Sequence, residues 1–252
     1  MIKRYKGKIK ILKAISQSAR NIMKSWKTLL LFLVPTLGLS LLLEMALTES
    51  GFMSFFGGVM VSQLLVDSVK VFFVLLIIKT TSNVMKGASI QPVHIMKVCF
   101  SKIIQIVFLG IICSAALVLP TAIAMVLMYA ITESQTAATL ITAVVLGILC
   151  VKIIFSVHGV VIENLDGLEG VKESLSLTKG NFLKIFITVT SLVLINYGMN
   201  LLLDTWLKGQ LAVYIVIPFV KALMAIFQVT LFTAMYHQVI RRLDLKEFYG
   251  DI

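Results

Sequence analysis

The stretch IIQIVFLGIICSAALVLPTAIAMVLMYA, residues 103–130, decides the fold class of this chain. It contains no charged residue, and a helix of this length is long enough to cross the roughly 30 Å hydrocarbon core of a membrane. Five further apolar stretches can be counted, at 28–47, 58–78, 137–157, 182–203 and 211–235. The sequence therefore predicts an all-α integral membrane protein with six transmembrane helices.

The composition supports a membrane fold. The mean hydropathy is +0.99, and 59% of the 252 residues are hydrophobic whereas 14% are charged. Soluble domains have about 25% charged residues. Six spans leave no room for a water-soluble domain, so we expect one membrane domain: a basic amphipathic segment at 1–27, a six-helix bundle at 28–236 and a cytoplasmic tail at 237–252.

Lys and Arg gather in alternate connections between the predicted spans. Nine precede the first span, at Lys3, Arg4, Lys6, Lys8, Lys10, Lys13, Arg20, Lys24 and Lys27. Others follow the second and fourth spans and the last one, and they include Lys79, Lys86, Lys172 and Arg241. The opposite connections contain only Lys208. Because cytoplasmic loops retain positive charge, both termini are predicted to lie in the cytoplasm.

The cytoplasmic connections also have helical patterns. Asp166 can cap a helix with Glu169 at its third position, and Gly180 can end it. Three apolar residues would then share one face, namely Leu168, Val171 and Leu175. Residues 11–24 and 93–102 are similar. We therefore expect short amphipathic cytoplasmic helices between transmembrane hairpins.

The basic N-terminal segment has two interpretations. Its positive residues alternate with apolar ones, which is typical of a helix on an anionic inner leaflet. The residues predicted to contact anionic lipid are Lys6, Lys10, Lys13, Arg20, Lys24 and Lys27. Alternatively, these charges only fix the topology.

Polar residues inside the spans form a candidate intramembrane cluster, because a charge at the centre of a bilayer costs about 2.5–3.5 kcal/mol or more. The candidates are Gln63, Asp67, Lys70, Asn196, Asn200 and Lys221. In one interpretation Asp67 pairs with Lys70, and Lys221 finds an acid or a carbonyl. In the other, a polar cleft shared by the second, fifth and sixth spans admits water, an ion or a lipid headgroup, and its excess positive charge favours an anionic guest.

No catalytic, cofactor-binding or metal-binding constellation is predicted. His94, His158 and His237 occur singly, and the sequence contains no HExxH, GxSxG, GxGxxG or Walker motif. The three cysteines lack CxxC spacing, so we expect packing residues at Cys99, Cys113 and Cys150. The net charge of +11 is explained by the loops beside the membrane, so a nucleic-acid partner is not expected.

Residues 155–185, FSVHGVVIENLDGLEGVKESLSLTKGNFLKI, carry a pattern of their own. Glu163 closes an apolar run, Ser174 lies in the amphipathic helix, and Lys179, Gly180 and Asn181 form a turn into the next span. Near the C-terminus, small residues precede Tyr236 and a basic tail. With these features the chain resembles the bacterial glycerophosphoryl diester phosphodiesterase membrane-domain family.

The resemblance implies an anchor or accessory module in the bacterial cytoplasmic membrane, since the family's catalysis resides in a separate soluble domain. The leading hypothesis is a non-enzymatic accessory protein that acts through lipid or through a membrane protein partner, in membrane stress, anchoring or self-immunity. The main alternative is a small transporter or channel that uses the Asp/Lys cluster. An intramembrane enzyme acting on lipids is a third hypothesis, for which neither paired acids nor a nucleophile can be named.

Overall fold

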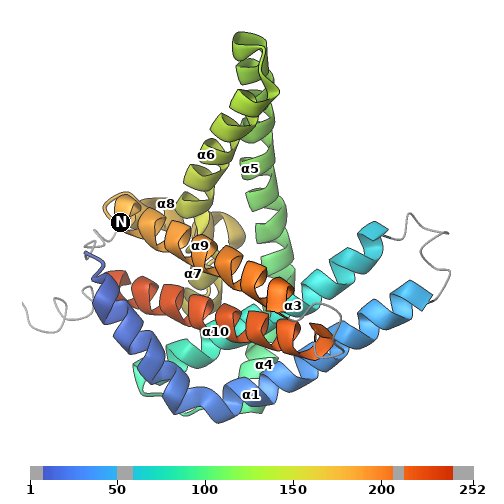
Figure 1. The fold of residues 1–252 in the computed structure, drawn as a ribbon. Helices are drawn as coiled ribbons and strands as arrows, with labels where there is room; N and C mark the ends of the chain where they lie inside the picture. The colour runs from blue at the N-terminus through green and yellow to red at the C-terminus, as the bar shows by residue number, and fades with distance from the viewer. Residues whose placement is uncertain (1–7, 50–58, 207–212, 241–252) are drawn as a thin grey trace, which may run out of the picture. The chain divides into compact units, whose positions relative to one another are not determined.

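A computed structural model describes residues 8–49, 59–206 and 213–240, and the elements in this part of the chain are α-helices (Figure 1). They are α1 Ile11–Glu49, α3 Val59–Lys86, α4 Pro92–Ser101, α5 Ile103–Thr132, α6 Gln135–Ile153, α7 Ser156–Glu163, α8 Gly167–Thr178, α9 Phe182–Trp206 and α10 Val213–Ile240. No strand occurs among the described residues. The predicted all-α fold is confirmed.

Six helical segments of the described chain are long and apolar enough to cross a membrane. They are Ile11–Ser40, Asp67–Lys86, Ile103–Thr132, Gln135–Glu163, Phe182–Leu203 and Val216–Ile240. Each overlaps one of the six predicted stretches. The protein therefore has the helices of a multi-pass membrane protein, as the sequence predicts.

Several helices continue beyond the predicted ends of the spans. α1 begins at Ile11, so most of the basic segment and the first span form one helix, which contains Pro35 and bends along its length (Figure 1). α3 continues to Lys86, so Lys79 and Lys86 belong to a helix rather than to a loop. The bonds of a helix run between its own backbone groups, so it need not end where the side chains change from apolar to charged.

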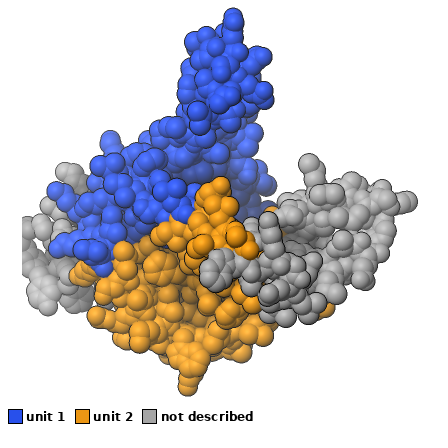
Figure 2. Space-filling view, in the orientation of Figure 1, with its two compact units in different colours: residues 1–12, 102–194, 235–252 blue, residues 13–101, 195–234 orange. Residues whose placement is uncertain are grey.

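The chain divides into two compact units, which are coloured separately in Figure 2. Unit 1 comprises residues 1–12, 102–194 and 235–252, and unit 2 comprises residues 13–101 and 195–234. Among the described helices, unit 1 therefore holds α5 to α8, the first part of α9 and the end of α10. Unit 2 holds most of α1, all of α3 and α4, and the remainder of α9 and α10.

In unit 1, α5 and α6 pack side by side as a hairpin (Figure 1). Glu133 ends α5 in the left-handed conformation, with a φ of 53°, and the Ser134 hydroxyl accepts the N–H of Ala137 at the start of α6. In the most apolar part of α5, 11% of the residues are buried, and Ile104 and Ile131 are largely exposed. Apolar surface on this scale is suited to contact with acyl chains.

The fourth span is interrupted between α6 and α7. Ile154 and Phe155 separate the two helices, and a side chain of α8 bonds to the backbone there. The buried Ser174 hydroxyl donates to the carbonyl of Lys152 at 2.7 Å and accepts the N–H of Phe155 at 3.0 Å. The sequence placed Ser174 in the family-like motif, and the structure assigns it this bridging position.

Two glycines allow α7 and α8 to pack closely. A Cβ on Gly170 would lie 2.9 Å from the carbonyl oxygen of Ser156, and one on Gly159 would lie 3.5 Å from the Cα of Gly170. The predicted capping box of Asp166 and Glu169 is present at the start of α8. This end of the helix is therefore correctly predicted from local sequence.

The two faces of α8 differ in burial. On the predicted apolar face, Leu168 and Leu175 are about half exposed, whereas the packed face buries Gly170, Ser174, Leu177 and Thr178. One expectation is corrected: the helix ends at Thr178, and Gly180 follows it without the positive φ of a glycine cap, which Gly87 has instead after α3.

The N-terminal segment is anchored in unit 1 by bonds to distant residues. The backbone N–H of Ile9 donates to the side-chain oxygen of Asn181 at 2.8 Å, and the Lys184 ammonium donates to the carbonyl of Ile9 at 2.7 Å. The N–H of Lys10 donates to the side chain of Gln238 at 2.9 Å. Asn181, another residue of the family-like motif, therefore helps to fix the start of the chain.

Aromatic rings fill the interior of unit 1 near the end of α10. Tyr236 is fully buried and stacks on His158, with ring centroids 5.6 Å apart. Phe155 lies 5.8 Å from the ring of His158 and 5.7 Å from that of Tyr236. The predicted closing Tyr is thus a core residue that joins α10 to α7.

In unit 2, α3 has the largest fraction of buried residues among the candidate spans. Its residues Leu75 to Ile78 are almost fully inaccessible, and the polar residues Thr80, Thr81 and Ser82 that follow are buried too. Gly87 then turns the chain, with a φ of 69°, and α4 packs back against α3. α3 is therefore the best-packed span of this unit.

Replacing Ser174 with Ala should destabilise unit 1, because the carbonyl of Lys152 and the N–H of Phe155 lose their bonds to the hydroxyl. Unsatisfied buried groups cost about 1–3 kcal/mol, so we expect Ser174→Ala to lower the free energy of unfolding by about 2 kcal/mol. Thermal unfolding in detergent measures the change. Ser176→Ala, at an exposed position of the same helix, should change it by less than about 0.5 kcal/mol. Equal effects of the two variants would contradict this role.

Candidate functional site

Three helices of unit 2 surround a cavity of about 490 Å³. α1, α3 and α10 supply its walls, which are mainly apolar and include Leu33, Phe73 and Ile217. Two ammonium-bearing side chains also line it, Lys70 from α3 and Lys221 from α10. We call this space the lysine cavity. Its volume lies within the range of pockets that hold small ligands.

Lys70 is paired within its own helix. Its ammonium nitrogen lies 3.3 Å from a carboxylate oxygen of Asp67, three residues earlier in α3. Both side chains are about half exposed, at 55% and 51%, so the pair by itself adds little stability. The structure thus contains the Asp67–Lys70 pair that the sequence predicts. Asp67 does not line the lysine cavity, although Lys70 does.

Lys221 has a different environment. Its ammonium group forms no ion pair or hydrogen bond with any residue that the structure describes. The expectation that Lys221 finds an acid or a carbonyl in the bundle is therefore not met within the described chain. α10 brings no acid close to it, since Ile217, Pro218, Met224 and Ala225 are its neighbours one turn away.

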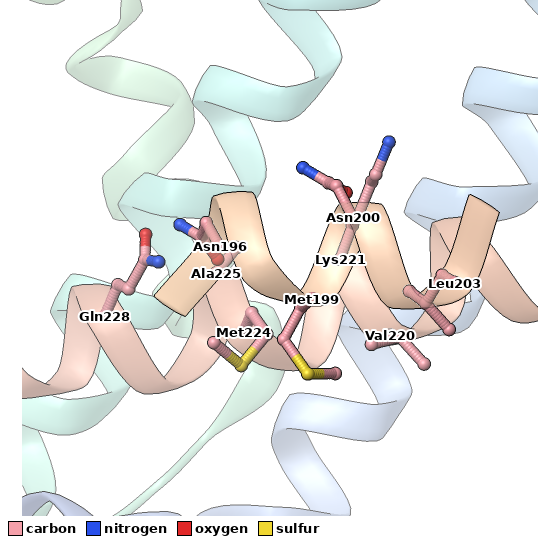
Figure 3. Close-up of a pocket in the computed structure, with 9 residues that line it drawn as sticks. All are labelled: Asn196, Met199, Asn200, Leu203, Val220, Lys221, Met224, Ala225 and Gln228. Atoms are coloured by element: carbon pink, nitrogen blue, oxygen red, sulfur yellow. The ribbon is translucent and has the colours of Figure 1, made fainter. Parts of the chain in front are cut away.

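A second cavity, of about 330 Å³, lies between α9 and α10 and is lined by Lys221 as well (Figure 3). Asn196 and Asn200 of α9 are four residues apart and so share a face, and Gln228 follows Lys221 on α10. We call this space the amide cavity. Figure 3 shows the side chains of Asn200 and Lys221 pointing in the same direction, with Met199 and Met224 directed the other way.

The polar side chains of the amide cavity are not bonded to the rest of the described protein. Asn196, Asn200 and Lys221 make no hydrogen bond with a described residue. The side-chain nitrogen of Gln228 is buried and likewise has no described partner. Lys221 is exposed and the two asparagines are partly buried, so a guest could reach these groups and bond to them.

A third cavity, of about 570 Å³, is lined mainly by apolar side chains of α1, α3 and α4. Leu39, Phe72 and Met96 are among them. Thr36 lines both this cavity and the lysine cavity, although its hydroxyl already donates to the carbonyl of Phe32. An apolar space therefore adjoins the lysine cavity at α1.

The sequence-predicted cluster is brought together in part. Lys221 meets Asn196 and Asn200 in the amide cavity, and it meets Lys70 in the lysine cavity. Gln63 lies in α3, but its side chain is outside the described residues. The predicted cluster does not include α1, in which Leu33, Thr36, Leu37 and Ser40 share the face that lines the lysine cavity. Their helical spacing is the signal in the sequence that could have indicated this face.

The residues of the family-like motif lie elsewhere, in unit 1. Ser174, Asn181 and Tyr236 are buried there and have the structural contacts described above. Lys179 and Gly180 are exposed, and Glu163 is the partly buried last residue of α7. These positions account for the motif as part of the framework of unit 1.

The basic residues at the start of α1 are accessible. Lys10, Lys13, Arg20, Lys24 and Lys27 are exposed, whereas Lys6 lies outside the described residues. The apolar side chains beside them are exposed as well, namely Leu12, Met23 and Trp26. Exposed cations and exposed apolar side chains on one helix favour contact with a membrane surface.

The helices and their exposed apolar surfaces define the class: this is a multi-pass, all-α membrane protein, and unit 2 contains cavities that lysine and amide side chains line. Comparisons of the chain with protein-family models, with curated proteins and with solved structures gave no match. The family resemblance suggested by the sequence stays a prediction.

Cys99 is a packing residue, as the sequence predicts. It is fully buried in α4, and burial raises the pKa of its thiol to about 12 although Lys79 acts in the opposite direction. Alkylation requires the thiolate, which a thiol of pKa about 8.5 supplies readily at pH 8.

We therefore expect Cys99, in a variant carrying Cys113→Ala and Cys150→Ala, to react with a maleimide at least about 100-fold more slowly at pH 8 than an ordinary exposed thiol. The control is His94→Cys, at an exposed position of α4 in a variant lacking the three native cysteines. Mass spectrometry follows the labelling. Similar rates for the two thiols would show that Cys99 is accessible in the folded protein.

Proposed function

We propose that this chain is a non-enzymatic protein of the bacterial cytoplasmic membrane whose role depends on binding an anionic lipid. The observation that supports this proposal is the lysine cavity, in which Lys70 and Lys221 lie among mainly apolar walls. A guest with one anionic group and an apolar chain satisfies both features of this space.

The charge balance favours an anion over a cation or a neutral guest. Lys70 and Lys221 bring two positive charges to the cavity, and Asp67 pairs with Lys70. The ammonium of Lys221 is left without a described counter-charge. An anion beside Lys221 would supply this missing counter-charge, so binding of an anion there is favourable.

The surface of the protein supports the same proposal. Exposed cations at the start of α1 and the exposed Leu168 and Leu175 of α8 would contact an anionic inner leaflet and its acyl chains. This arrangement requires α8 and both termini on the cytoplasmic side, as the distribution of Lys and Arg predicts. An accessory role in membrane stress, anchoring or self-immunity, through lipid or a membrane protein partner, fits these surfaces.

Removing the two cavity lysines should strongly reduce the retention of anionic lipid. We expect the detergent-purified protein to retain phosphatidylglycerol and phosphatidic acid in native mass spectrometry, and to retain phosphatidylcholine much less. The variant Lys70→Met with Lys221→Met should lose at least about tenfold in anionic lipid retained, since a bond to a charged group is worth about 1.5–3 kcal/mol.

The matched control is Lys97→Met, which removes an exposed lysine of unit 2 that lines none of the three cavities. This variant should retain anionic lipid like the wild type. Retention that is equal in the double variant and in the wild type would rule out the lysine cavity as the binding site.

A small transporter or channel is the second candidate function, and Lys221 is the observation that favours it. This residue lines two cavities, so one side chain is accessible from two spaces inside unit 2. The three helices of the lysine cavity also carry buried hydroxyls, at Ser25, Thr80 and Thr230. A series of polar groups beside a cation is a feature of ion pathways.

Chloride efflux from proteoliposomes tests this second function with a chloride-sensitive dye. If Lys221 is part of a pathway, Lys221→Met should reduce the rate at least tenfold, and Asp67→Asn should alter it because Asp67 pairs with Lys70. Wild-type efflux no faster than that of empty liposomes, or efflux that neither substitution changes, removes the transporter hypothesis.

A further inference from the structure

We propose that Lys221 binds the phosphate of a phosphodiester lipid and that the amide cavity holds its uncharged, hydroxyl-bearing headgroup. This inference rests on the proposed function, and it adds the chemical class of the lipid. Glycerol and inositol are headgroups of this class. The carrying observation is that Lys221 lines both the lysine cavity and the amide cavity.

The position of Lys221 corresponds to the position of phosphate in such a lipid. In a phosphodiester lipid the phosphate lies between the acyl-bearing part and the headgroup. In unit 2, Lys221 is likewise shared by a cavity with mainly apolar walls and a cavity with several amides. A phosphate at the ammonium group would place the apolar part beside Leu33 and Phe73 and the headgroup beside Asn196 and Asn200.

The amide groups favour hydroxyls. Each Asn or Gln side chain offers both donors and an acceptor, so it can bond to a hydroxyl in either direction. Asn196, Asn200 and Gln228 come from two facing helices, and no hydrogen bond to another described residue occupies them. A glycerol headgroup can bond to several of them at once.

The same lining disfavours other headgroups. An ethanolamine ammonium would approach Lys221, and the described residues that line the amide cavity include no carboxylate to offset the repulsion. Phosphatidic acid has no headgroup beyond its phosphate, so the amides would stay unbonded when it occupies the site. The expected order of affinity is phosphatidylglycerol, then phosphatidic acid, then phosphatidylethanolamine.

Competition between these lipids for the wild-type protein tests the inference, with native mass spectrometry as the readout. We expect phosphatidylglycerol to be retained about tenfold more than phosphatidic acid, because two or more hydrogen bonds are added. Asn196→Leu with Asn200→Leu should remove this preference while phosphatidic acid is retained as before. Leu201→Met, at an exposed position of the same helix that does not line the amide cavity, should leave the preference intact.

The outcomes separate this inference from the proposed function. In one outcome, the double lysine variant loses anionic lipid while the wild type retains phosphatidylglycerol and phosphatidic acid equally. That pair of results supports the lysine cavity and overturns the headgroup assignment. Failure to retain any anionic lipid overturns both. The wild-type competition needs no variant, so a misfolded amide variant does not prevent the decision.

Discussion

Backbone groups that are buried inside a protein need hydrogen-bond partners there, because neither water nor acyl chains supply them. Continuous helices meet this requirement along the candidate spans, and at the junction between α6 and α7 a side chain meets it instead. Ser174 supplies it by bonding to Lys152 and Phe155 at once. That bond requires α8 to lie against α7, and this approach in turn requires glycine at position 170. The arrangement of unit 1 follows from this one constraint.

The parts of the fold that depend on neighbours in sequence could be predicted. Six apolar stretches give the candidate spans, and the Asp166–Glu169 capping box depends on residues three apart. The role of Ser174 could not be predicted, because its partners lie 22 and 19 residues away. The packed face of α8 could not be predicted for the same reason, because Gly170 and Ser174 lie against residues of α7 and of the α6–α7 junction that are distant in sequence.

The candidate site was predictable to the same extent. Helical spacing places Asp67 with Lys70, Asn196 with Asn200, and Lys221 near Gln228. Spacing within one helix does not reveal which helices are neighbours, so α1 was missed and Asp67 was grouped with Lys221. The structure separates them: Asp67 pairs with Lys70, and Lys221 lines the two cavities. Tertiary packing thus decides which of several polar residues can meet a guest.

The contrast between Lys70 and Lys221 links the stability of unit 2 to binding. α3 compensates its lysine with an acid one turn earlier, whereas α10 has Pro218 and Ile217 at the equivalent distance from Lys221. Lys221 lies about 12 Å along α10 from Val213, at about 1.5 Å per residue, which is far for an ammonium group to reach the membrane interface. Its side chain is exposed and no described acid compensates its charge, so an anion beside it is favourable. A ligand that binds only the folded state stabilises that state, so an anionic lipid at Lys221 would make the folding of unit 2 depend on the composition of the membrane.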